Sequence, residues 1–178
     1  MQINSPILFL EINDSNFVFL AFENKEGDNL NLIYENVIPI EGLKEKRIVD
    51  LKIFLNLIKE NIYLIEQKLN FTFKEIILII DNFDCSILTF SGYKKLNGSQ
   101  LSKEDVTFII NFLKIQINET EKNKKILHIF NSKNLLDNKS TINLPIGLFG
   151  NFYSQELSFF LININDYKNL KNIFEKCN

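Results

Sequence analysis

Residues 75–81 read Glu-Ile-Ile-Leu-Ile-Ile-Asp, a run of five apolar residues between two acidic ones. Four of the five are isoleucines, whose branched side chains favour extended backbone. A continuous apolar run predicts a strand buried on both faces, and such strands usually lie in the centre of a sheet, parallel to a neighbour. We therefore expect residues 76–80 to return into a sheet that the preceding chain has begun.

A helix is predicted immediately before this strand. Asp50 can cap its start, because an Asp side chain accepts hydrogen bonds from the N–H groups of a first helical turn. Apolar residues then recur at helical spacing, which is the strongest periodic signal in the chain. They are Leu51, Phe54, Leu55, Ile58, Ile62, Ile65 and Leu69.

Three strands are predicted before the helix, at residues 7–10, 17–23 and 30–39. Turn-forming residues separate them at 13–16 and at 24–29. The first eighty or so residues therefore have the order β-β-β-α-β.

The pattern changes after Asp81, where we expect a second body. Strands are predicted at 85–90, 125–130 and 156–162, an apolar hairpin at 142–150, and turns at Ser91-Gly92 and Asn97-Gly98. Ser102 and Asp105 match a capping box before a helix whose apolar stripe is Val106, Ile109, Ile110, Leu113 and Ile117. Asn165 is expected to cap a last helix with Tyr167, Leu170, Ile173 and Phe174 on its inner face. The predicted fold class is α+β, with residues 83–164 inserted between 1–82 and 165–178.

Composition excludes several classes of protein. The formal net charge is −2 and Arg47 is the only arginine, which argues against binding to nucleic acid or to an anionic membrane. No run is long enough to span a membrane and no signal peptide begins the chain. Cys85 and Cys177 match no metal-ligand or redox spacing, so we expect two free, buried thiols in a cytoplasmic protein.

Several segments together resemble the bacterial cell-division FtsA family of the actin-like, ribonuclease-H-like superfamily. They are the β-β-β-α-β opening, Ser102-Lys-Glu-Asp-Val106, Ile126-Leu-His-Ile129, Leu144-Pro-Ile-Gly-Leu-Phe-Gly150 and Lys171-Asn-Ile-Phe-Glu-Lys-Cys177. The fourth is similar to the family's Asn-Pro-x-Gly-Leu-x-Gly segment. Their order and spacing fit across nearly the whole chain.

The resemblance implies a function in assembling the division machinery. Residues 1–82 and 165–178 would be subdomain 1A, and residues 83–164 the inserted subdomain 1C, or SHS2. The family binds ATP and Mg²⁺, self-associates, links FtsZ to the inner membrane, and recruits late division proteins such as FtsN through 1C. It is peripheral to the inner membrane at the division site.

The family's proteins are longer than this chain, and their second half carries the other phosphate loop and the FtsZ-binding surface. We therefore expect a protein-binding module that is no enzyme by itself, holds no cofactor and inserts no segment into the membrane. The chain is either a fragment or a naturally shortened protein. Two alternatives remain: an actin-like ATPase, or a pilus-assembly adaptor like PilM, although the Pro-x-Gly-Leu-x-Gly segment favours the division protein.

The first predicted turn is where the family wraps nucleotide phosphates. Glu11 would face the metal, and Ser15 keeps a hydroxyl donor. Asn13 stands where the family has glycine, and Asp14 adds a negative charge that would repel phosphate. We favour a plain hairpin turn over a remnant of an ATP site.

A second group of residues is considered for binding a partner protein. An exposed apolar loop would hold Leu148, Phe149 and Phe152 on a frame of Pro145, Gly147 and Gly150, and a packed hairpin is an equal alternative. Tyr93, Lys94 and Lys95, with Lys122, Lys124 and Lys125, would form a docking edge, although solvated turns are the preferred interpretation. His128 is the only histidine and is interpreted as structural, as are both cysteines.

Overall fold

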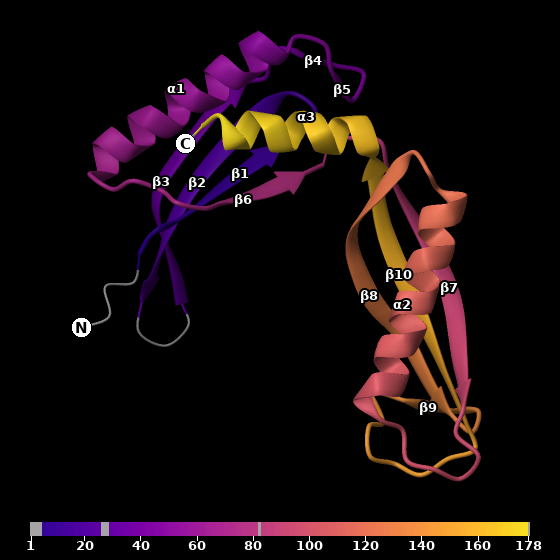
Figure 1. Ribbon diagram of the computed structural model, residues 1–178. Helices are drawn as coiled ribbons and strands as arrows, with labels where there is room; N and C mark the ends of the chain where they lie inside the picture. Colours follow the sequence, from indigo (N-terminus) through magenta and orange to yellow (C-terminus); the bar gives the residue numbers. More distant parts are fainter. Residues whose placement is uncertain (1–4, 26–28, 82, 178) are drawn as a thin grey trace. The chain divides into compact units, whose positions relative to one another are not determined.

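The computed structural model describes residues 5–25, 29–81 and 83–177. The chain divides into two compact units (Figure 1). Unit 1 comprises Met1–Asp84 and Asn165–Asn178, and unit 2 comprises Cys85–Ile164. Both combine strands with helices, which confirms the predicted α+β class.

Unit 1 is built on a sheet in the order β3-β2-β1-β6. The strands are β1 (Ile7–Ile12), β2 (Asn16–Lys25), β3 (Asn29–Pro39) and β6 (Ile76–Ile80). Strands β1, β2 and β3 form an antiparallel meander, and β6 lies parallel to β1 with Leu10 opposite Leu78. The expected turn at 24–29 includes residues 26–28, which lie outside the described residues.

The position of β6 corrects one prediction. Its parallel pairing is confirmed, but within the described residues it lies at the edge of the sheet and not in its centre. Ile77 and Ile79 are 45% and 44% exposed, because only the face bearing Ile76, Leu78 and Ile80 is turned toward the core. The apolar run predicts that both faces of β6 are buried, but in the described residues one face is exposed.

Two helices cover one face of the unit 1 sheet (Figure 1). Helix α1 (Leu51–Leu69) buries Phe54, Ile58, Ile62 and Ile65, as its periodicity predicts. Asp50 caps it by accepting hydrogen bonds from the N–H groups of Lys52 and Ile53, both at 3.0 Å. The Phe54 ring meets Phe17 of β2 edge-on, with centroids 5.0 Å apart. A small hairpin, β4 (Leu43–Lys44) and β5 (Arg47–Ile48), precedes α1.

The last helix, α3 (Ile164–Glu175), buries Leu170 and Ile173 on the predicted face. It starts directly after a strand of unit 2, so Asn165 lies in the first turn and the prediction that Asn165 is the cap is wrong.

Unit 2 is an antiparallel sheet with one helix across it. Its strands are β7 (Cys85–Lys95), β8 (Lys124–Leu136), β9 (Lys139–Thr141) and β10 (Phe152–Asn163), in the order β7-β10-β8-β9. Helix α2 (Lys103–Thr120) lies over one face of this sheet (Figure 1). The core comprises residues of α2 and β10, among them Ile109, Leu113, Tyr153, Phe159 and Leu161.

Two strands of unit 2 run further than predicted. The turn expected at Ser91-Gly92 is wrong, because β7 continues through both residues to Lys95. Gly92 is required there for packing: a Cβ at this position would lie 2.5 Å from Ile109 Cγ2 of α2. Strand β8 continues past Phe130 to Leu136 and turns into β9 through Asp137 and Asn138, whose φ angles of 49° and 64° suit a tight hairpin.

The apolar hairpin predicted at 142–150 is wrong: no strand forms at these residues, and Phe149 instead makes an isolated bridge with Gln100. Pro145 has no N–H group to donate to a strand ladder. The turn at Asn97-Gly98 and the capping box are confirmed. Asn97 and Gly98 have φ angles of 53° and 85° in a turn. Ser102 and Asp105 form the capping box at the start of α2, with each side chain bonded to the other residue's backbone N–H at 3.1 Å. None of the helices in the described part of the chain combines the length and the apolar character that crossing a membrane requires.

Candidate functional site

The first hairpin turn, between β1 and β2, is organised by Asn13. Its Oδ1 accepts hydrogen bonds from the N–H groups of Ser15 at 3.1 Å and Asn16 at 2.8 Å, and its Nδ2 donates to Glu11 Oε1 at 3.4 Å. A phosphate site in such a turn needs N–H groups that point at the anion. Here the Asn13 side chain already occupies two of them, and Asp14 lies exposed beside it. The turn therefore closes on itself by local hydrogen bonds.

The segment around Pro145 is held by backbone bonds but keeps apolar side chains outside. Pro145 and Gly150 are buried, and the Gly147 N–H donates to Leu101 O at 2.8 Å. Gly147 has a φ of 85°, a conformation that L residues rarely adopt. Leu148 and Phe149 are nevertheless 54% and 70% exposed. These two side chains do not fill the core of the unit, whereas Phe152 is half-buried at the start of β10.

The predicted docking residues of β7 point to opposite faces of the sheet. Tyr93 is exposed and stacks on Phe152, with ring centroids 5.4 Å apart. Lys94 points toward α2, where its Nζ lies 3.5 Å from Asp105 Oδ1 and 4.6 Å from the centroid of the Phe108 ring. Lys95 is exposed at the end of the strand. The structure thus joins Tyr93 with Phe152 and Lys94 with α2.

The pKa of the Asp105 carboxyl is held below its ordinary value. The hydrogen bond from the Ser102 backbone is the main cause, and the Ser102 hydroxyl and the nearby Lys94 ammonium add to it. Asp105 therefore carries its negative charge through the neutral range and fixes Lys94 against the start of α2.

An exposed stripe on α2 was missed by the sequence analysis. Phe108, Phe112 and Ile115 are 54%, 49% and 55% exposed, and the rings of Phe108 and Phe112 stack with centroids 6.4 Å apart. The signal was present: these residues repeat at spacings of four and three, which places them on one side of a helix. The predicted stripe of Val106, Ile109, Ile110, Leu113 and Ile117 describes one apolar side of α2, and the structure shows a second.

The remaining predicted residues are dispersed. The prediction that both cysteines are buried is wrong, because Cys85 is exposed on the edge strand β7 and Cys177 is half-buried. His128 is exposed on β8, and its ring lies 6.0 Å from that of Phe130. Lys122 and Lys125 are exposed, and Lys124 Nζ contacts Glu121 at 3.2 Å and donates to Ser86 Oγ at 3.0 Å. In the described part of the chain, His, Cys, Asp and Glu side chains form no group of three that could hold a metal ion.

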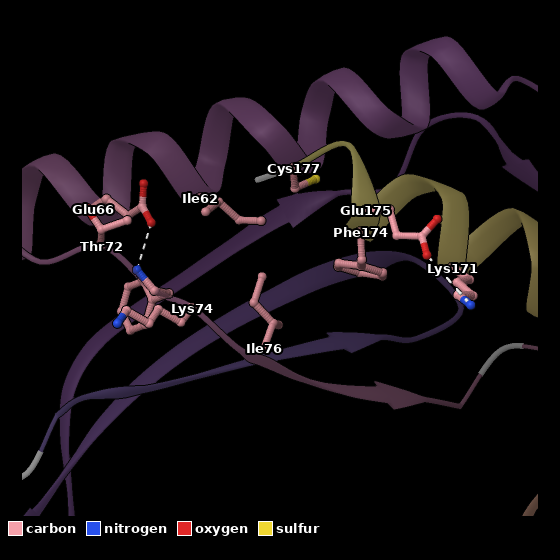
Figure 2. Close-up of a pocket in the computed structure, with 10 residues that line it drawn as sticks. Ile62, Glu66, Thr72, Lys74, Ile76, Lys171, Phe174, Glu175 and Cys177 are labelled. Atoms are coloured by element: carbon pink, nitrogen blue, oxygen red, sulfur yellow. Dashed lines mark hydrogen bonds and ion pairs between the residues drawn. The ribbon is translucent and has the colours of Figure 1, made fainter.

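Unit 1 contains a pocket of about 700 Å³ that none of the predicted site residues lines (Figure 2). Its walls come from α1, β6, the chain between them, and α3: Ile62, Glu66, Thr72, Phe73, Lys74, Ile76, Lys171, Phe174, Glu175 and Cys177. Two acids are already engaged, since Glu66 accepts from the Phe73 N–H at 2.8 Å and Glu175 pairs with Lys171 at 3.6 Å.

Burial shifts the pKa of two groups of unit 1, and one of them, Cys177, lines the pocket. Burial raises the pKa of the Cys177 thiol, which keeps it protonated, although Lys59 opposes the effect. Burial likewise raises the pKa of Asp166, and Arg47 opposes it. The pocket is an apolar hollow with a charged rim.

Comparison with known proteins finds a distant sequence similarity to a cell-division protein and a likeness of fold to a solved structure. No family model matches the chain. The chain is 24% identical over 173 residues to the cell division protein FtsA of Buchnera aphidicola subsp. Schizaphis graminum (strain Sg), which covers 96% of this chain and 40% of that protein. The chain therefore spans less than half the length of this relative.

A similar solved structure is the PilM-PilN type IV pilus biogenesis complex. The TM-score is 0.62 at 9% sequence identity, over 99% of this chain and 45% of the matched chain. This likeness concerns the fold, and it supports the predicted fold class. The assignment of the two units to subdomains 1A and 1C, and the roles of the individual site residues, stay predictions.

Proposed function

We propose that this chain is a protein-binding module of an FtsA-like cell-division protein. The sequence similarity to an FtsA spans nearly the whole chain, and the residues that resemble the family lie in both units. The observation that carries the proposal is the surface of unit 2, where Leu148, Phe149, Tyr93 and the α2 stripe expose apolar side chains. Exposed apolar patches on a folded body mark interaction surfaces.

The partners follow from the family resemblance. Late division proteins such as FtsN would bind unit 2, and FtsA-type self-association would be head-to-tail, since a contact between unlike surfaces builds filaments. FtsZ would be bound by the second half of the family's architecture. The location would be the cytoplasmic side of the inner membrane at the division site.

We also propose that the chain alone performs no ATPase reaction. The turn N–H groups that would meet a phosphate are bonded to Asn13, and Asp14 adds a negative charge beside them that would repel phosphate. ATP and Mg²⁺ would be bound by the full-length members of the family. Titration calorimetry with Mg-ATP tests this: micromolar affinity for this chain would contradict it.

Binding to the cytoplasmic segment of FtsN tests the main proposal. We expect calorimetry at low salt to show binding, and Leu148→Ser to weaken it by about tenfold. Leu30→Ser is the matched control, because Leu30 has the same exposed fraction, 54%, but lies on β3 of unit 1. Folded protein that shows no binding, or equal loss in both variants, would contradict the proposal.

A pilus-assembly adaptor is the second candidate, and the structural likeness to the PilM-PilN complex favours it. The same calorimetry with the cytoplasmic tail of PilN separates the two candidates. Tighter binding to that tail than to the FtsN segment would support the pilus function over cell division.

A further inference from the structure

Strand β7 has an outer edge that faces away from β10. In the described part of the chain β7 pairs with β10 alone, although it runs for 11 residues. Every second residue of such a strand turns its N–H and C=O groups to the outer edge. These groups form a template to which another extended chain can add.

The exposed stripe of α2 lies on the same side of unit 2 as this edge. Asp105, Phe108, Phe112 and Ile115 follow one another at spacings of three or four residues, so they share one side of α2. Lys94 of β7 contacts both Asp105 and Phe108, which places that side next to β7.

Gly92 and Phe90 of β7 lie on the face of the sheet that α2 crosses. Gly92 lies under Ile109 and Leu113, so α2 crosses close above β7 at this point. Phe90 is two residues away on the same face of the strand, and it is 42% exposed. An open backbone edge and a row of apolar side chains therefore run side by side.

We propose that this surface, formed by the outer edge of β7 with Phe90 and by Phe108, Phe112 and Ile115 of α2, binds an extended segment of a partner protein as an added strand. The segment would carry apolar side chains at alternate positions, because residues two apart in a strand share a face. An acidic residue at one end would match the exposed Lys95 at the end of β7. This inference rests on the proposed function and specifies its partner class.

Surface area favours a peptide over a second copy of the chain. The four apolar side chains are each about half exposed, which amounts to on the order of 400 Å². A standard interface between folded proteins buries about 800 Å² on each partner. An added strand needs less apolar surface, since backbone hydrogen bonds supply affinity and the side-chain contacts supply specificity.

The test begins with a displayed library of random twelve-residue peptides, selected on the full chain. The strongest peptide is then synthesised and its affinity measured by fluorescence anisotropy. We expect apolar residues at alternate positions, and a loss of about tenfold or more in affinity for Phe90→Ser and for Phe112→Ser. Phe112→Leu keeps most of the affinity, and circular dichroism confirms that each variant is folded.

Phe130→Ser is the matched control, because Phe130 is 53% exposed and contacts Phe160 on the face of the sheet opposite to α2. Affinity within about twofold of the unaltered chain is expected for it. If the affinity for the peptide falls in Phe130→Ser alone, the assigned surface is wrong, although the chain still binds a peptide. If no peptide is enriched, both the assigned surface and the binding function are contradicted. If sedimentation shows a dimer of the unaltered chain that Phe112→Ser converts to a monomer, the surface binds a second copy of the chain instead.

Discussion

The two units end in very different edge strands. Strand β6 of unit 1 holds five apolar residues and no polar one, and it pairs with β1 in parallel. Strand β7 of unit 2 is more than twice as long, mixes apolar with hydroxyl side chains, and ends in Lys94 and Lys95. Lysine at an edge discourages unspecific pairing with other chains, whereas a bare apolar edge attracts them. Strand β6 thus has the composition of an interior strand, whereas β7 combines an open edge with the residues of the proposed binding surface.

Gly92→Val would test the continuity of β7 with the largest expected effect. The new side chain would collide with Ile109 and Leu113, since even a Cβ would lie 2.5 Å from Ile109 Cγ2. We expect the free energy of unfolding to fall by about 1–3 kcal/mol in urea denaturation. Ser91→Val, at an exposed neighbouring position, serves as the control and should change stability little. Equal stability of both variants would mean that α2 does not pack on β7 at this point.

Ser102→Ala should have a smaller effect on the free energy of unfolding, about 1 kcal/mol, because it removes one half of the capping box of α2.

The pKa of Asp105 is lowered in the folded protein, so this carboxylate stabilises the fold above its ordinary pKa of 3.8. That contribution is lost as the pH falls below about 4 and through the folded-state value. Between pH 7 and pH 3 the melting temperature should therefore fall less in Asp105→Asn than in the unaltered chain, which thermal unfolding measures.

Ile77→Lys would probe the edge of unit 1 with the smallest effect on stability. Ile77 is 45% exposed, so a lysine can lay its stem along the sheet and place its ammonium in water. We expect a change within about 0.5 kcal/mol in the free energy of unfolding, together with slower aggregation measured by light scattering. Unchanged aggregation would show that the β6 edge is not an attractive surface.

Local signals in the sequence predicted much of this fold. The stripe of α1, the Asp50 cap and the capping box of α2 depend on residues a few positions apart, so their spacing in the chain is sufficient. The parallel return of β6 was likewise predicted from its apolar run. Its edge position was not, because the number of neighbours of a strand depends on the whole sheet.

The errors and omissions have physical causes. Gly92 indicates a turn in the sequence, but the close approach of α2 explains it in the structure. The Phe108, Phe112 and Ile115 stripe was hidden because α2 is apolar on two sides, and only tertiary contacts show which side is covered. The unit 1 pocket joins residues more than 100 positions apart, such as Ile62 and Phe174, which no local pattern can connect.

Hydrogen exchange on the full chain, with and without the selected peptide, tests the central claim about β7 most directly. An added strand would satisfy the outward N–H groups of β7, so exchange should slow at every second residue within 86–94 and stay unchanged at 76–80 in β6. Slowing at β6, or at neither edge while the peptide is bound, would contradict the account.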